Sequence, residues 1–193
     1  MKNLIQIVII VAFLFSCKSE SKKEVKDGHQ HPKVEKKETS KKKVLSPHTY
    51  AMSMVGDAHV HIDYSSPGVR GRIIFGGLLA YDQVWQAGAH KATWLDTTKD
   101  LIVAGKELKA GKYGIFMIPS KGEWTIIFNT NWDQHGKDDY DEKEDVLRFK
   151  VTPKISDEIQ EHLEYKVSKT NKTSGSIRMS WEKISIEFLF NVN

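Results

Sequence analysis

Two histidines separated by a single residue form the pattern in this sequence with the clearest chemical use. His59 and His61 flank Val60 in a segment that alternates between polar and apolar residues. Such alternation predicts a β-strand, on which side chains two apart point to the same face, about 6–7 Å apart at Cα. Two imidazoles on one face can therefore converge on a single metal ion.

Two more histidines, His90 and His135, could reach this pair from loops. Three or four imidazoles suit a zinc or copper ion. The carboxylates of Asp63 and Asp133 are placed to accept hydrogen bonds from coordinating rings and so to orient them. We therefore expect a zinc or copper site whose ligands are His59, His61, His90 and His135.

Three functions are compatible with such a site. The first is a binding module that captures a metal or a small ligand at the histidine face. The second is a metal-dependent hydrolase, in which three histidines hold the ion and an open position activates water; no residue stands out as its catalytic base. The third is a structural envelope protein whose histidines only face solvent. We expect no nucleotide or organic cofactor, because no phosphate-binding loop or dinucleotide fingerprint occurs.

The N-terminus predicts export and lipid attachment. Lys2 precedes an uninterrupted apolar run over residues 7–15, which has the length of a signal-peptide core and is too short for a membrane span. The run ends at Ser16 and Cys17, the single cysteine of the chain. This resembles the lipobox of bacterial lipoproteins, although Phe15 is bulky for its place, and implies cleavage of residues 1–16 and lipidation of Cys17. We expect anchoring to the outer membrane of the cell envelope, facing the periplasm or the cell surface.

A lysine-rich tether follows, over residues 17–45. Residues 18–43 contain ten lysines, five acidic residues and almost no apolar side chains, a composition typical of disorder. The net charge of +4 belongs to this end of the chain, because residues 44–193 hold 18 basic and 20 acidic residues. Nucleic-acid binding thereby loses its electrostatic support. Within the tether, His29 and His31 form a second, isolated pair of histidines.

The remaining residues, 46–193, predict one all-β domain. Short segments with strand-like composition are separated by turns, which indicates an antiparallel β-sandwich or jelly roll. In residues 58–64 the alternation directs Val60, Ile62 and Tyr64 to one face and the two histidines to the other. Pro119 and Gly122 bound a hairpin loop. Further strands are expected at residues 72–75, 93–98, 100–103, 112–118, 123–129, 145–152, 162–169, 176–182 and 185–190, and a short helix-like stretch at 156–161.

Distinctive motifs run from Tyr64 to Thr93, with Phe75-Gly76-Gly77-Leu78 and Val84-Trp85-Gln86-Ala87-Gly88-Ala89-His90, and continue at residues 110–119 and 124–129. In these motifs the domain resembles domain-of-unknown-function family 2911, exported proteins mostly of Bacteroidetes-type bacteria. The resemblance covers nearly the whole domain and implies no established activity. In the common pattern an arginine stands where this chain has Gln86, and an asparagine where it has His90. Any role of that arginine or asparagine does not carry over to this chain.

Within these motifs, three side chains are candidates for contact with a ligand. Arg70 and Arg72 could hold an anionic group through two hydrogen bonds, or could instead fix a loop against carboxylates. Trp85, in a loop-like segment, is a candidate for lining a pocket.

Overall fold

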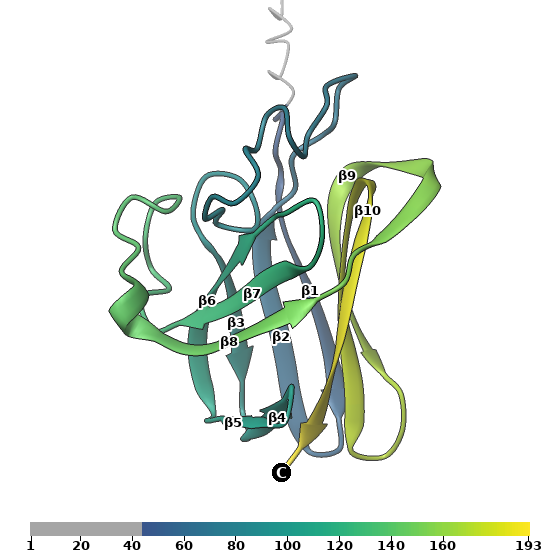
Figure 1. The fold of residues 1–193 in the computed structure, drawn as a ribbon. Helices are drawn as coiled ribbons and strands as arrows, with labels where there is room; N and C mark the ends of the chain where they lie inside the picture. The colour runs from purple at the N-terminus through teal and green to yellow at the C-terminus, as the bar shows by residue number, and fades with distance from the viewer. Residues whose placement is uncertain (1–43) are drawn as a thin grey trace, which may run out of the picture. The chain divides into compact units, whose positions relative to one another are not determined.

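The computed structural model describes residues 44–193 (Figure 1). The signal peptide predicted at residues 1–16, the lipidation of Cys17 and nearly all of the tether predicted at residues 17–45 lie outside the described residues. Within the described part, no helix has the length and apolar character needed to cross a membrane.

Ten strands build two antiparallel sheets, so the predicted all-β class is confirmed (Figure 1). The larger sheet has six strands in the order β1-β2-β3-β6-β7-β8. Its strands are β1 (His48–Val55), β2 (Ala58–Ser65), β3 (Thr93–Thr97), β6 (Gly111–Ile118), β7 (Trp124–Asn129) and β8 (Asp145–Val151). The predicted hairpin loop at Pro119 and Gly122 joins β6 to β7, where Ile118 pairs with Thr125.

The smaller sheet has four strands in the order β5-β4-β10-β9. These are β4 (Leu101–Val103), β5 (Lys106–Leu108), β9 (Lys154–Lys169) and β10 (Ser174–Val192). Two long strands, β9 and β10, form a hairpin whose register shifts near Glu182, a residue with a positive φ of 56°. A single 3₁₀ turn, η1 (Glu142–Glu144), precedes β8.

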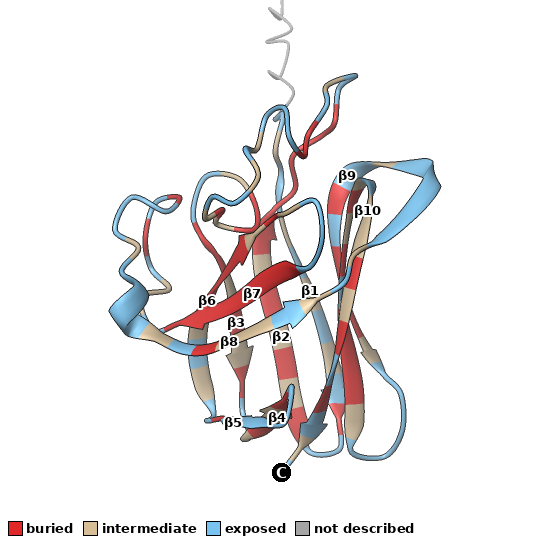
Figure 2. Cartoon of the chain, in the orientation of Figure 1, coloured by how far each residue is buried: buried red, intermediate tan, exposed pale blue. Residues whose placement is uncertain are grey.

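One hydrophobic core lies between the two sheets (Figure 2). It joins Val60 and Ile62 of β2 to Ile177 and Phe190 of β10, and all four side chains are buried. Tryptophan rings fill its centre, with Trp181 stacked on Trp85 at 5.8 Å between centroids. The predicted inward face of residues 58–64 is thus the face that the core occupies.

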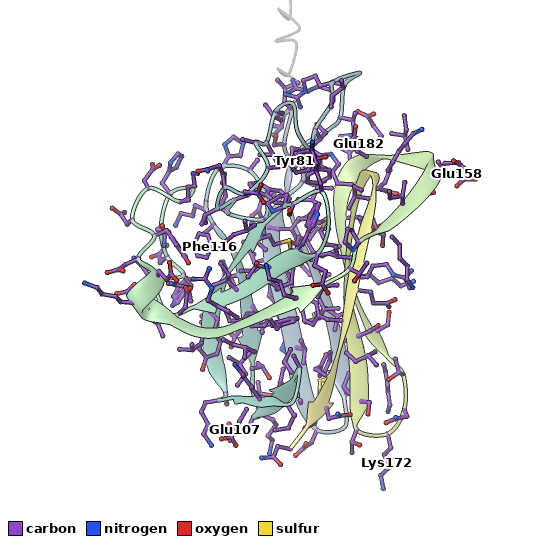
Figure 3. All side chains as sticks on the ribbon, in the orientation of Figure 1. Tyr81, Glu107, Phe116, Glu158, Lys172 and Glu182 are labelled. Atoms are coloured by element: carbon purple, nitrogen blue, oxygen red, sulfur yellow. The ribbon has the colours of Figure 1, made fainter. Side chains whose placement is uncertain are left out.

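The outer face of the six-stranded sheet is covered over only part of its width. Phe116 of β6 and Ile127 of β7 belong to a second buried cluster that loop residues complete, among them Val84 and Tyr140. Side chains of the surrounding loops lie around Phe116 in Figure 3. On β1 and β2 the outward residues are exposed or half-buried, so this part of the sheet presents an open surface.

Three predictions of secondary structure from the sequence were wrong. Residues 48–55 form the edge strand β1, although no strand was expected there. Residues 72–75 form turns and one isolated bridge, Phe75 to Leu79. The stretch 156–161, expected to be helix-like, is extended and belongs to β9, where Gln160 pairs with Glu182 of β10 between two register shifts.

A buried hydrogen-bond junction fixes the long loop between β2 and β3. The carbonyl of Ala87, a residue with a positive φ of 55°, accepts hydrogen bonds from Thr93 Oγ1 and from the Tyr165 hydroxyl, both at 2.9 Å. The Tyr64 hydroxyl accepts from the backbone N–H of Tyr165 at 3.2 Å. The junction ties the loop to β9 as well as to β3.

Substitution Tyr165→Phe should lower the free energy of unfolding by about 1 kcal/mol, the usual net contribution of a hydrogen bond between neutral groups. The carbonyl of Ala87 keeps its bond from Thr93, which limits the loss. Urea denaturation measures the difference. The matched control is Tyr50→Phe at an exposed position, expected within about 0.5 kcal/mol of the wild type; equal effects of the two variants would contradict a role for the junction.

Alkaline pH should destabilise the protein through the same residue. Burial raises the pKa of Tyr165 well above its usual 10.0. Above pH 10 the unfolded chain loses this proton and the folded chain keeps it, so stability is complete below pH 10 and falls as the pH rises, by up to about 1.4 kcal/mol per pH unit. Denaturation midpoints measured on both sides of pH 10 should decline less steeply for Tyr165→Phe. Equal slopes would show that Tyr165 does not carry the effect.

Candidate functional site

The open face of β1 and β2 is set by the register of the two strands. Met54 pairs with His59, Met52 with His61 and Tyr50 with Asp63. All six residues lie on the outward side, because the alternating residues of β2 are buried in the core. Directly opposed side chains on one face have Cβ atoms about 4.5–5.5 Å apart. Imidazole, thioether, phenol and carboxylate groups therefore share one small surface.

His59 is fixed by its backbone and contacts a methionine through its ring. Its N–H donates to Thr98 Oγ1 at 2.9 Å. Its Nε2 lies 3.5 Å from the sulfur of Met52, the diagonal neighbour on β1. The rings of His59 and His61 are 6.0 Å apart between centroids and tilted by 36°. The two histidines predicted to share a strand face therefore do so.

His61 is held between two aromatic rings. Tyr50 stacks on one side at 5.4 Å with an interplanar angle of 19°, and Trp94 of β3 stacks at 5.4 Å with an angle of 29°. Stacking covers the faces of an imidazole and leaves the in-plane nitrogens free to bind a proton or an ion. The ring is thus oriented while its chemistry remains available.

Asp63 lies beside this stack, at the end of the row of outward-facing residues His59, His61 and Asp63 on β2. Its Oδ2 is 4.0 Å from His61 Nε2, and its Oδ1 is 2.8 Å from His48 Nε2. His48 and Asp63 also line a cavity of about 100 Å³ to which His90 contributes. Asp63 is therefore well placed to orient histidine rings, the role predicted for it, and His90 approaches the row at this end.

The other predicted ligands lie on two loops that meet through their backbones. The carbonyl of His90, at a φ of 62°, accepts from Gly136 N–H at 2.7 Å, and Lys91 forms a bridge with His135. The His135 ring is exposed and lies 3.3 Å from Asp138.

The carboxylate of Asp133 bonds to Lys91 Nζ at 2.8 Å, and this hydrogen bond raises the pKa of Lys91. Among residues 44–193, no three His, Cys, Asp or Glu side chains are arranged to hold one ion. The structure thus brings His59, His61 and Asp63 together on β2, whereas His135 pairs with Asp138 on its own loop and Asp133 pairs with Lys91 on the other loop.

Of the three residues predicted to contact a ligand, two make structural hydrogen bonds through their side chains and the third through its backbone. Arg72 donates through its guanidinium to the carbonyls of Val69 at 3.0 Å and Gly68 at 2.6 Å, which fixes the loop in which it stands. Arg70 is exposed, and its backbone N–H donates to Glu161 Oε1 at 2.9 Å. Trp85 is buried, with its indole N–H donating to the carbonyl of Gly88 at 3.0 Å.

A lysine lies at the Trp94 end of the stack that Tyr50, His61 and Trp94 form. Lys112 Nζ lies 4.5 Å from the ring centroid of Trp94 and 4.7 Å from that of Trp132. The two indoles are 5.6 Å apart and tilted by 60°. The two indoles are thus already in contact with a cation of the protein itself.

Sequence reasoning missed the part of this surface that β1 contributes. His48, Tyr50, Met52 and Met54 alternate along the strand, and that alternation was the available signal. It was obscured because the outward positions carry large apolar side chains and the inward positions are Thr49, Ala51 and Ser53, which reverses the usual pattern of an amphipathic strand.

Comparison with curated proteins and with solved structures gives no match for this chain. A family model described as a protein of unknown function, DUF2911, matches residues 46–190. The match spans three quarters of the chain and both sheets, and it confirms the resemblance carried by the motifs between Tyr64 and Asn129. The chain therefore belongs to the DUF2911 family of proteins of unknown function.

Proposed function

We propose that this protein is a lipid-anchored binding domain of the cell envelope that captures a transition-metal ion, zinc or copper, at the open face of β1 and β2. The observation that carries the proposal is the pair of imidazoles of His59 and His61 on one outward face, with ring centroids 6.0 Å apart.

The anchor is supported by the sequence alone. The apolar run at residues 7–15 ends in Ser16-Cys17, the pattern at which bacterial lipoproteins are cleaved and lipidated. The lysine-rich tether gives reach between the lipid and the domain. It also places positive charge near anionic headgroups, which attract such segments by about 1 kcal/mol per basic residue near the surface.

Substitution Cys17→Ser should abolish incorporation of an alkyne-labelled palmitate fed to the expressing bacteria. It should also move the chain from the membrane fraction to the soluble fraction, because a single apolar run of this length anchors poorly without lipid. The matched control Ser16→Ala should retain both label and membrane association. Label that persists in the Cys17→Ser variant would contradict lipidation at this residue.

The metal site is supported by the distance between the two imidazole rings and by the carboxylate of Asp63 beside them. Zn–N bonds are about 2.0–2.1 Å long, so the two nitrogens that share an ion lie within about 4 Å of each other. Rings whose centroids are 6.0 Å apart satisfy this when their in-plane nitrogens turn inward. Asp63, next to His61 Nε2, supplies the carboxylate that commonly orients a metal-bound imidazole.

The binding module is favoured over the hydrolase by the number of convergent ligands. A hydrolytic centre uses three protein ligands and an open position for water. Of the four histidines predicted from the sequence, His59 and His61 are in ring contact within the described part of the chain. A site with two histidines at an open surface is suited to capture and release of an ion.

The metal proposal is tested on full-length chain purified in detergent without a histidine tag. His29→Ala/His31→Ala serves as a common background that removes the pair in the tether. Titration calorimetry should give about one Zn²⁺ or Cu²⁺ per chain. His59→Ala/His61→Ala should weaken binding by more than about 10-fold, which corresponds to about 1.4 kcal/mol.

The matched control is His90→Ala/His135→Ala, which removes two exposed imidazoles from the loops and is expected to change the affinity by less than about 3-fold, within about 0.7 kcal/mol. Binding that survives in the His59→Ala/His61→Ala variant, or is lost equally in both double variants, would overturn the assignment of the site to β2.

A further inference from the structure

Two methionines stand directly opposite the two histidines of the proposed site. Met54 pairs with His59 and Met52 with His61 across the ladder of β1 and β2. Met52 also reaches diagonally, with its sulfur 3.5 Å from His59 Nε2. We call Met52, Met54, His59 and His61 the Met–His quartet. Its members occupy the four corners of a small square on the sheet surface.

The thioethers are in contact with solvent and stand outside the core. Met52 is 55% exposed and Met54 is 53% exposed. The chain has five methionines, and apart from Met1 the other two, Met117 and Met179, are buried in the core, where methionine ordinarily fills gaps. Packing of the core therefore does not explain the two methionines on β1.

The distance between Met52 Sδ and His59 Nε2 also suits two donor atoms that coordinate one ion. In sites of a filled-shell ion such as zinc, metal–nitrogen bonds are about 2.0 Å and metal–sulfur bonds about 2.3 Å. Two such donors at a tetrahedral angle lie about 3.5 Å apart. This equals the observed separation of Met52 Sδ and His59 Nε2, so little movement is needed for both to coordinate one ion.

We infer that the Met–His quartet is a copper(I) site. Thioethers are soft ligands that select monovalent copper, whereas imidazole accepts copper, zinc and nickel alike. The chain has a single cysteine, Cys17, outside the domain, so methionine is the soft sulfur donor available to this surface. The inference deepens the proposed function and rests on it, because His59 and His61 belong to both.

The neighbours of the quartet favour a soft, monovalent ion. Tyr50 and Trp94 cover both faces of the His61 ring and limit the access of water to that corner. Of the two carboxylates beside the quartet, Asp63 is already engaged: it bonds to His48 at 2.8 Å, and its Oδ2 lies 4.0 Å from His61 Nε2. The other, Asp96, is the register partner of His61 on β3.

Competition for copper(I) against the chelator bicinchoninate, under anaerobic conditions and on the full chain with His29→Ala/His31→Ala, tests the inference. One copper(I) per chain is expected. Met52→Leu/Met54→Leu preserves volume and should weaken copper(I) binding by at least about 10- to 100-fold, since even loss of a residue that only orients a ligand costs that much. The same variant should keep its affinity for Cu²⁺ or Zn²⁺ within about 3-fold, or about 0.7 kcal/mol.

The control Met179→Leu, in the core, should leave copper(I) binding unchanged. Copper(I) affinity that is unchanged in Met52→Leu/Met54→Leu overturns the methionine site and leaves the histidine proposal standing. Failure of the wild type to bind either copper(I) or a divalent ion overturns both.

A second measurement needs no substitution. In protein labelled with ¹³C at the methionine methyl groups, silver(I), a stable analogue of copper(I), should shift the resonances of Met52 and Met54. Those of the buried Met117 and Met179 should stay in place and serve as internal controls. Shifts confined to the buried methyl groups, or absent from all four, would overturn the inference.

Discussion

The pairing of β1 with β2 is the constraint on which the open face depends. Val60 and Ile62 are completely buried, so the inward side of β2 cannot change without emptying part of the core. Because side chains alternate strictly along a strand, a slip of one residue would exchange the two faces. The core thereby holds His59 and His61 outward, and the register of β1 decides which side chains they meet.

A second constraint is the long loop between β2 and β3, which covers the outer face of the sheet on one side of the histidines and leaves the other side open. The long loop before β3 is fastened at the carbonyl of Ala87 by Thr93 and Tyr165. From there the loop runs over β6, where Ala92 joins Phe116 in the outer cluster. The cover ends near Trp94, so the stack of rings marks the border between buried and exposed sheet.

The sequence was sufficient to predict the strand β2 and its two faces, and insufficient to predict the neighbouring strand β1. On β2, buried aliphatic residues alternate with polar ones, and this contrast predicts both the strand and its faces. On β1 the larger apolar side chains point outward, as Met52 does, and small residues such as Ala51 point inward against β9 and the core, so hydropathy gives no contrast. Which loops bring His90 and His135 together depends on contacts between residues over 40 positions apart, and no local pattern encodes them.

The balance of charge on this face bears on which ion the proposed site would favour. Thioethers and neutral imidazoles contribute no charge, so a bound copper(I) leaves one positive charge on the face and zinc leaves two. Asp96 lies opposite His61 on β3, but it also pairs in register with Lys112 of β6, whose ammonium is held over Trp94. Asp63, whose Oδ2 lies 4.0 Å from His61 Nε2, has no lysine opposite it across the ladder, and a carboxylate at such a distance offsets one charge. With Asp96 and Lys112 counted as a cancelling pair, Asp63 would balance the single charge of copper(I) and would leave one charge of a zinc ion uncompensated.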